Sequence, residues 1–304
     1  MVCRVGRGSS AGWPAGRVCV ITGGAQGIGW ELAVLLARGG ARVFTNDVDD
    51  QALERAATQA AGMGYGQVYL ERADVTDFGQ VSSWIEGVRR QAGRIDVLVN
   101  NAAFVRWQDV EEMAVDDALR TMRTAYDGMV HTLAAVLPVM REAGSGSIAN
   151  VGSCLSRMHG PGPSAAYVAG KAAVEAFTDM LRLELAGTPL KVTLVRPGLV
   201  AGTDFFRRRV PSSRLPRLAD FVPALTAEQV ARAVLRGLST GAATVDVPRY
   251  LPLVYRAYDF SPRLVQYLSS LGGPARRDFG HQPPGHREET RNGSRTAPGA
   301  ADVS

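Results

Sequence analysis

The sequence contains very little lysine. Of its 34 basic residues only Lys171 and Lys191 are lysines, and the other 32 are arginines. The net charge of +5 is modest for 304 residues, and no basic cluster is interleaved with aromatic residues that could stack on bases. We therefore expect no nucleic-acid partner. Lys171 follows Tyr167 by four residues in the segment SAAYVAGKAAV, which raises the question of what this rare side chain does.

Cysteines and long apolar runs are also scarce. Cys3, Cys19 and Cys154 show no spacing typical of metal ligands, and their odd number argues against a disulfide framework. No segment reaches the ~18 uninterrupted apolar residues of a membrane span. Residues 1–16 lack the apolar stretch of a secretion signal. These absences predict a cytoplasmic protein without a metal site.

From residue 17 onward, short β-branched segments alternate with longer amphipathic ones. This alternation predicts an α/β fold, a single doubly wound (Rossmann-type) seven-stranded parallel sheet with helices on both faces. The predicted strands are 17–21, 41–46, 67–71, 95–100, 146–151, 191–196 and 243–247. The predicted helices are 27–40, 49–62, 77–93, 113–142 with Pro138 as a candidate kink, and 164–187.

The composition changes toward both ends of the chain. We expect a flexible N-terminal extension (1–14), a dinucleotide-binding catalytic domain (15–250), a helical extension (251–271) and a disordered tail (272–304). The segment 198–225 lacks periodicity, so it fits either a mobile lid over a site or a solvated surface loop. The aromatic, amphipathic segment 248–271 is expected to pack across the pocket or a neighbouring subunit, with a membrane-surface helix as the alternative.

A glycine-rich segment, TGGAQGIG at 22–29, joins the first predicted strand to the first predicted helix. Glycine permits positive φ and close approach of a pyrophosphate, and the helix N-terminus offers unpaired N–H groups. A tight turn alone also explains the glycines, but their place between a strand and a helix favours dinucleotide binding.

Asp47 ends the second predicted strand, eighteen residues after Gly29. A carboxylate there can accept both hydroxyls of an adenosine ribose and would repel the 2′-phosphate of NADP. We therefore predict NAD as the cofactor, with a cap on the helix beginning near Asp49 as the alternative role of Asp47. Asp74 and Asn100 follow the next two strands, at the edge where open α/β sheets bind ligands, although each residue type is also common in turns.

Tyr167 and Lys171 are four residues apart in a predicted helix, so they share one face with Cβ atoms ~5–6 Å apart. A nearby cation favours the phenolate and brings a phenol closer to working pH as a proton donor or acceptor. A tyrosine packing beside a solvated lysine is the alternative, but the rarity of lysine favours a functional role. Ser153 ends the fifth predicted strand, where its hydroxyl can either polarise a substrate carbonyl or cap a turn.

Taken together, these motifs resemble the classical short-chain dehydrogenase/reductase family over about residues 15–250. They are, in order, TGGAQGIG at 22–29, DVTD at 74–77, NNAA at 100–103, Ser153, YVAGK at 167–171 and RPG at 196–198. The resemblance implies that Tyr167 is the general acid/base, that Lys171 lowers its pKa and binds the nicotinamide ribose, and that Ser153 polarises the carbonyl. It implies a cofactor site formed by Gly23, Gln26, Gly27, Ile28, Gly29, Asp47, Asp74, Val75, Asn100, Tyr167, Lys171, Pro197 and Gly198.

The activity implied is NAD-dependent interconversion of a secondary alcohol and a ketone by a homodimer or homotetramer. A hydrophobic substrate is expected from the apolar side chains of the candidate lid and of the segment after NNAA, with a place in the hydrophobic core as the alternative for each. They are Phe205, Phe206, Leu215, Phe221, Val105 and Trp107. An NAD-binding regulatory or scaffold protein with impaired catalysis is the alternative.

The sequence departs from the family pattern at three places. Ala125 stands where an asparagine usually helps to hold a proton-relay water, which puts that relay in doubt and motivates the scaffold alternative. Ala103 replaces the glycine of the usual NNAG motif. Ser153 precedes Tyr167 by fourteen residues rather than thirteen, so we expect the loop that contains Met158 and His159 to bulge by one residue.

Overall fold

The computed structural model describes residues 12–63, 67–159, 162, 164–204, 207, 210, 215, 217–271 and 275. Most of the expected N-terminal extension and of the expected disordered tail lies outside these residues. So do Phe205 and Phe206 of the candidate lid.

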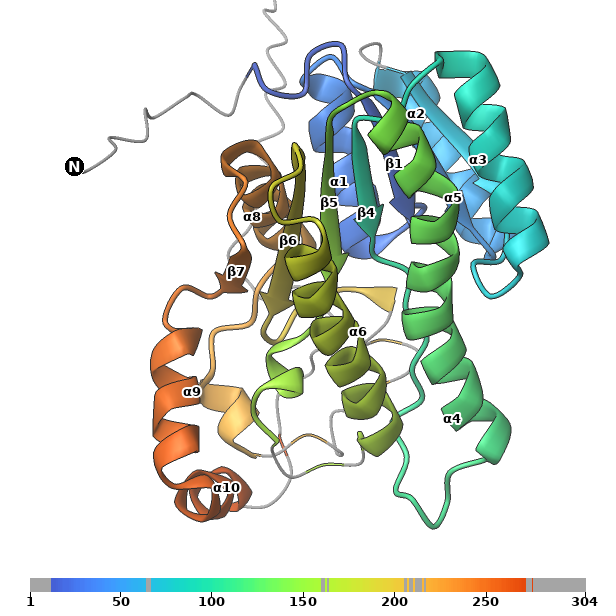
Figure 1. Cartoon of the computed structure of the whole chain (residues 1–304). Coiled ribbons are helices and arrows are strands. Elements are labelled where there is room, and N and C mark those ends of the chain that lie inside the picture. Colours follow the sequence, from blue (N-terminus) through green and yellow to red (C-terminus); the bar gives the residue numbers. More distant parts are fainter. Residues whose placement is uncertain are drawn as a thin grey trace, which may run out of the picture.

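Seven parallel strands form one sheet in the order β3-β2-β1-β4-β5-β6-β7 (Figure 1). They are β1 (Val18–Thr22), β2 (Arg42–Asp47), β3 (Gln67–Arg72), β4 (Val97–Asn100), β5 (Gly146–Val151), β6 (Leu190–Pro197) and β7 (Thr244–Val247). All seven coincide with predicted strands to within two residues, and the predicted fold class is confirmed. The central strands are buried along their length rather than alternately, because helices cover both faces of the sheet.

Two groups of helices cover the two faces. Side chains of α1 (Gly27–Arg38), α2 (Asp50–Met63) and α8 (Ala227–Thr240) form one hydrophobic core, with α1 packed beside α8. On the other face, α3 (Phe78–Ala92), α5 (Gly128–Glu142) and α6 (Ala165–Glu184) form a second core. Figure 1 shows α5 and α6 in front of the sheet and α1 and α8 behind it.

Helix α8 is missing from the sequence prediction. Its start is marked by a capping box, in which the Thr226 side chain accepts from the backbone N–H of Gln229 and the Gln229 side chain accepts from that of Thr226. The signature T-x-x-Q was present in the sequence, and it follows directly on the aperiodic segment 198–225.

The helix predicted at 113–142 is interrupted, although not at the predicted kink. The chain forms α4 (Val115–Met122), a π-helical turn (Arg123–Asp127) and then α5, which runs through Pro138 to Glu142. Ala125 lies buried within the π-helical turn. Such turns are frequent at functional sites.

The segment expected to form a helical extension contains two helices, α9 (Leu251–Phe260) and α10 (Pro262–Ser270). The break follows from Pro262, because the residue before a proline is displaced from helical geometry, and Ser261 has φ −148° and ψ 80°. Figure 1 shows both helices beyond the carboxyl end of the sheet. Across the described residues, no helix is both long and apolar enough to cross a membrane.

Candidate active site

A pocket of about 850 Å³ lies at the carboxyl ends of the strands, as expected for an open α/β sheet. It extends from Asp47 and Asp74 at one end to Ser153 and Tyr167 at the other. Every predicted site residue lines this pocket except Gly29 and Asn100. Residues as far apart in the sequence as Gly23 and Gly198 are therefore brought to one cavity.

The glycine-rich loop has the geometry that only glycine tolerates without strain. Gly23 and Gly27 have φ of 62° and 55°. A Cβ on Gly29 would lie 2.5 Å from the carbonyl oxygen of Gly23, so Gly29 is needed for packing although it does not face the pocket. No side chain caps the N-terminus of α1, and its first turn carries no acidic residue. Its N–H groups and positive dipole end suit the phosphates of a dinucleotide.

Asn101, rather than Asn100, faces the pocket at this end. Its Nδ2 donates to the carbonyl oxygens of Gly23 and Thr22, at 2.9 and 3.1 Å, and so holds the glycine-rich loop against β4. Asn100 is buried behind the pocket, where its side-chain amide donates to Asn150 Oδ1 at 2.8 Å. The NNAA motif identified the pair, but it did not distinguish which asparagine points toward the ligand.

Asp47 lines the pocket and is only 7% exposed. Its Oδ1 accepts the backbone N–H groups of Val48 and Asp49, at 2.8 and 3.2 Å. Burial raises the pKa of this carboxyl, and the backbone hydrogen bonds oppose that rise. The alternative role of helix cap belongs to Asp49, whose Oδ1 accepts from the N–H of Ala52 at 3.0 Å.

Asp74 and Val75, which follow β3, form the next part of the pocket wall. Asp74 Oδ1 accepts from the N–H and the hydroxyl of Thr76, at 2.9 and 2.8 Å, and so closes a turn while lining the pocket. The neighbouring Val75 is held through its carbonyl oxygen, which lies 2.9 Å from Nδ1 of His131. His131 on α5 was not singled out from the sequence, since a lone histidine in a helix carries no signal of such a contact.

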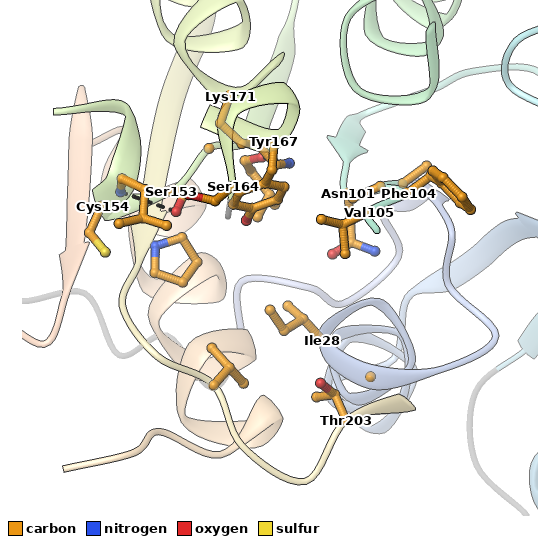
Figure 2. A pocket seen from close by; sticks show the side chains of 18 of the residues that line it. Ile28, Asn101, Phe104, Val105, Ser153, Cys154, Ser164, Tyr167, Lys171 and Thr203 are labelled. Atoms are coloured by element: carbon orange, nitrogen blue, oxygen red, sulfur yellow. Dashed lines mark hydrogen bonds between the residues drawn. The ribbon is translucent and has the colours of Figure 1, made fainter. Parts of the chain in front are cut away.

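Ser153, Tyr167 and Lys171 converge at the other end of the pocket (Figure 2). Ser153 Oγ accepts from the N–H of Leu155 at 3.2 Å, so this serine also starts the short helical turn Cys154–Ser156. Its hydroxyl is hydrogen-bonded to Tyr167 as well. The Tyr167 ring lies 5.9 Å from the Trp107 ring, centroid to centroid.

The side chain of Lys171 is buried at 4% exposure. Its Nζ donates to the carbonyl oxygen of Val151 at 2.7 Å and lies 6.0 Å from the centroid of the Tyr167 ring. Burial lowers the pKa of Lys171 to about 8.

Burial raises the pKa of Tyr167 to about 12, against the opposing hydrogen bond from Ser153. The ammonium of Lys171 is not among the groups that shift the pKa of Tyr167 in this arrangement, so the expected lowering by Lys171 stays a prediction. Removal of the phenol from water is the largest cause of the raised pKa.

A second, much smaller cavity lies behind Lys171. Its volume is about 10 Å³, and Ala125, Asn100 and Thr22 are among the residues around it. A cavity of this volume has room for about one water molecule. The space beside Ala125 is thus small and partly polar.

Comparisons with known proteins agree with this geometry. The family model described as short chain dehydrogenase matches residues 17–213. The chain is 36% identical over 185 residues to 3-oxoacyl-[acyl-carrier-protein] reductase FabG of Thermotoga maritima, covering 61% of this chain and 74% of that protein. It is 30% identical over 280 residues to 11-beta-hydroxysteroid dehydrogenase A of Sesamum indicum, covering 88% of this chain and 80% of that protein.

The chain belongs to the short-chain dehydrogenase/reductase family. It is an oxidoreductase that acts on CH–OH groups, and the family uses NAD or NADP. A solved short-chain dehydrogenase/reductase from Burkholderia phymatum, in complex with NAD, has the same fold, with a TM-score of 0.71 and 24% identity over 83% of this chain and 96% of that one.

In this short-chain dehydrogenase, residues beyond 213 complete the pocket. Its apolar wall combines residues near the predicted motifs with later ones, namely Val105, Trp107, Leu155, Leu199, Leu215 and Val254. Leu215 lines the pocket as predicted, whereas Phe221 is 75% exposed and lies outside it. From α9 and α10, Tyr258 and Val265 also face the cavity.

Proposed function

We propose that the protein interconverts a hydrophobic secondary alcohol and a ketone with NAD. The observation that carries this proposal is the convergence of Ser153, Tyr167 and Lys171 in one apolar pocket that continues to the glycine-rich loop. That pocket offers a dinucleotide site and a proton-transfer site in one continuous space. When bound, the nicotinamide cofactor supplies the hydride chemistry.

The side chains have distinct roles in this proposal. Tyr167 exchanges a proton between its Oη and the oxygen of the substrate, and Ser153 Oγ–H donates to the same oxygen. Lys171 donates to the nicotinamide ribose as well as to Val151 O, because an ammonium offers three N–H donors. With a pKa of about 12, Tyr167 is protonated at neutral pH, which suits donation to a ketone.

The preference for NAD over NADP rests on Asp47. Its buried carboxylate at the adenosine end of the pocket suits ribose hydroxyls and repels a 2′-phosphate. Asp47→Ser should weaken NAD binding and narrow the preference for NAD over NADP by about tenfold or more. Titration with NAD and with NADP measures both affinities. An unchanged ratio of the two affinities would show that Asp47 only accepts the backbone hydrogen bonds of its own loop.

A hydrophobic substrate is supported by the apolar wall and by relatives named for such substrates. These include 11-beta-hydroxysteroid dehydrogenase A of Sesamum indicum and cyclopentanol dehydrogenase of Comamonas. A panel of steroid, lipid and alicyclic alcohols, scored by NADH formation, would identify the class that is turned over.

Tyr167→Phe tests the enzyme against the scaffold alternative. Loss of the hydroxyl should lower the rate of NADH formation by about a hundredfold or more, because a phenyl ring cannot exchange a proton. NAD affinity should change little, as the ring and its contact with Trp107 remain. Equal rates in both proteins would favour the regulatory or scaffold protein.

Exposed apolar side chains on α6 bear on the assembly of the protein. We infer that the protein is a homodimer or homotetramer, which is supported by the apolar side chains of Met180 and Leu183 of α6, 56% and 67% exposed. A cytoplasmic location stays a prediction from the sequence. Light scattering coupled to size-exclusion chromatography tests the assembly, and a monomer at micromolar concentration would contradict it.

A further inference from the structure

The two C-terminal helices expose an unusual amount of apolar surface. On α10 and the residue after it, Leu264, Tyr267, Leu268 and Leu271 are 54%, 62%, 51% and 48% exposed. Their spacing of i, i+3, i+4 and i+7 places them on one outward stripe. On α9, Leu253 and Phe260 are 65% and 93% exposed. We call these six residues the outer apolar face.

This face is presented by helices that are fixed to the rest of the protein. On the inner side, Gln266 Nε2 donates to the carbonyl oxygen of His159 at 3.3 Å. Arg157 pairs with Asp259 at 3.4 Å. Leu251 and Tyr255, both 4% exposed, pack against Cys154. The inner sides of α9 and α10 are thus occupied, and the outer apolar face is a stable surface of the folded protein.

The segment that carries the outer apolar face also carries exposed positive charge. Arg249, Arg256 and Arg263 are exposed, and within the described part of the chain none of them has an ion-pair partner. Asp259 is the one acidic residue of the segment 248–271, and it already pairs with Arg157. The surface therefore combines exposed leucine and aromatic side chains with uncompensated positive charge.

Charge and composition distinguish the occupants that could cover this face. The segment 276–304 has Phe279 and Val303 as its only large apolar residues, so its composition does not suit the role. A second copy in a symmetric contact would bring Arg256 and Arg263 toward the same arginines of its partner. An anionic lipid surface matches both the apolar stripe and the positive charge.

We propose that the outer apolar face of α9 and α10 docks on an anionic lipid surface. The leucine and aromatic side chains enter the boundary between headgroups and acyl chains, and the arginines contact lipid phosphates. Tyr250, Val254, Tyr258 and Val265 of the same segment line the pocket. If the proposed function holds, a lipophilic alcohol dissolved in the bilayer lies one helix away from the catalytic side chains. The docking itself does not depend on that function.

Flotation of the full-length protein with lipid vesicles tests the proposal. Vesicles of phosphatidylcholine alone are compared with vesicles that contain about 30% phosphatidylglycerol. The wild type should float with the anionic vesicles, and added salt should weaken this binding because surface charge is screened. Leu264→Ser with Leu268→Ser should lower the partition coefficient by about tenfold or more, since two exposed leucines no longer enter the bilayer.

Two further variants complete the design. Arg256→Gln with Arg263→Gln should weaken binding to anionic vesicles by roughly tenfold, as each arginine near such a surface contributes about 1 kcal/mol. Val110→Ser with Val115→Ser, at sites 67% and 71% exposed on another part of the molecule, should leave binding unchanged. Circular dichroism and thermal unfolding confirm that each variant folds.

Three results would overturn the proposal. They are the absence of wild-type flotation, equal binding to neutral and anionic vesicles, and full binding by the double leucine variant. The wild type could fail to bind vesicles while the double leucine variant changes from oligomer to monomer. That result would show that the outer apolar face contacts a second copy of the chain instead. None of these readouts uses the enzymatic reaction, so failure of the docking and failure of the proposed function are distinguished.

Discussion

Lys171 combines a buried position with a charge that the proposed chemistry uses. Its pKa is lowered to about 8, from an ordinary value of 10.5, because burial disfavours the ammonium. Between these two values the unfolded chain binds more protons at this residue than the folded one does. The contribution of Lys171 to the free energy of unfolding therefore rises with pH across this window.

Comparison of the wild type with Lys171→Met isolates this contribution. Between pH 8 and pH 10.5 the stability of the wild type relative to the variant should rise by on the order of 3 kcal/mol. The buried thiol of Cys154, whose pKa is raised to about 11, opposes this rise in both proteins and cancels in the difference. Denaturant unfolding at several pH values measures it, and a flat difference would mean that the ammonium is not destabilised by burial.

The small cavity beside Ala125 limits which side chains fit at this position. The cavity beside it, about 10 Å³, accepts one oxygen atom more easily than a whole amide group. Ala125→Ser should thus alter stability by less than about 1 kcal/mol, whereas Ala125→Asn should cost about 1–3 kcal/mol through overpacking. Thermal unfolding of the two variants is the check. Equal melting temperatures would show that the π-helical turn can open to admit asparagine.

At the scale of elements, the strands and the helices α1, α2, α3 and α6 were predictable, whereas α8 and the interruption between α4 and α5 were not. Strands such as β1 and β4 are short β-branched runs bounded by turn residues, a local signal that burial on both faces reinforces. The helix boundaries depended on tertiary contacts: the π-helical turn at Arg123–Asp127 carries no local breaker, and Pro138 lies in a helix that continues through it.

The site residues divide in the same way. The glycine-rich loop and the Tyr167 and Lys171 pair follow from local spacing, so the sequence alone identified them. The pocket wall contributed by α9 and α10 depends on long-range packing that no motif encodes. Similarly, the lowered pKa of Lys171 follows from burial, which spacing cannot reveal.

Arg196 connects four elements around the catalytic end. From β6 its guanidinium donates to Glu175 of α6 at 3.0 Å and to both carboxylate oxygens of Asp246 of β7, at 2.8 and 3.1 Å. Tyr255 of α9 donates to the same carboxylate at 3.1 Å, and the guanidinium lies over its ring. The charged side chains are between 10% and 13% exposed, so this network is poorly screened by water.

Arg196→Gln should therefore destabilise the protein by about 3 kcal/mol, since it leaves two nearly buried carboxylates without their cation. Arg232→Gln is the matched control. Arg232 pairs with Glu228 on the surface of α8, with side chains 62% and 48% exposed, and the loss of such a pair should cost less than about 1 kcal/mol. Denaturant unfolding compares them, and similar losses would show that the Arg196 network is solvated.

At the scale of the whole molecule, the pocket is lined by segments that connect to helices on both faces of the sheet. Its lining comes from loops that follow β1, β2, β3, β4, β5 and β6, and from the C-terminal helices. A dinucleotide bound there contacts segments that pack on both faces of the sheet. Binding should therefore stabilise the described fold as one cooperative unit, by an amount set by mass action.

Gly29→Ala tests this stabilisation. A Cβ at that position meets the Gly23 carbonyl oxygen at 2.5 Å and Gly24 Cα at 2.8 Å, so the glycine-rich loop must move. At a hundredfold excess over its dissociation constant, NAD should raise the melting temperature of the wild type by about 5 °C or more in a single transition. The variant should lose most of this shift. Gly87→Ala, in open space within α3, should keep it and gain up to about 1 kcal/mol from helix propensity. If Gly29→Ala retained the full shift, the glycine-rich loop would not be where the dinucleotide binds.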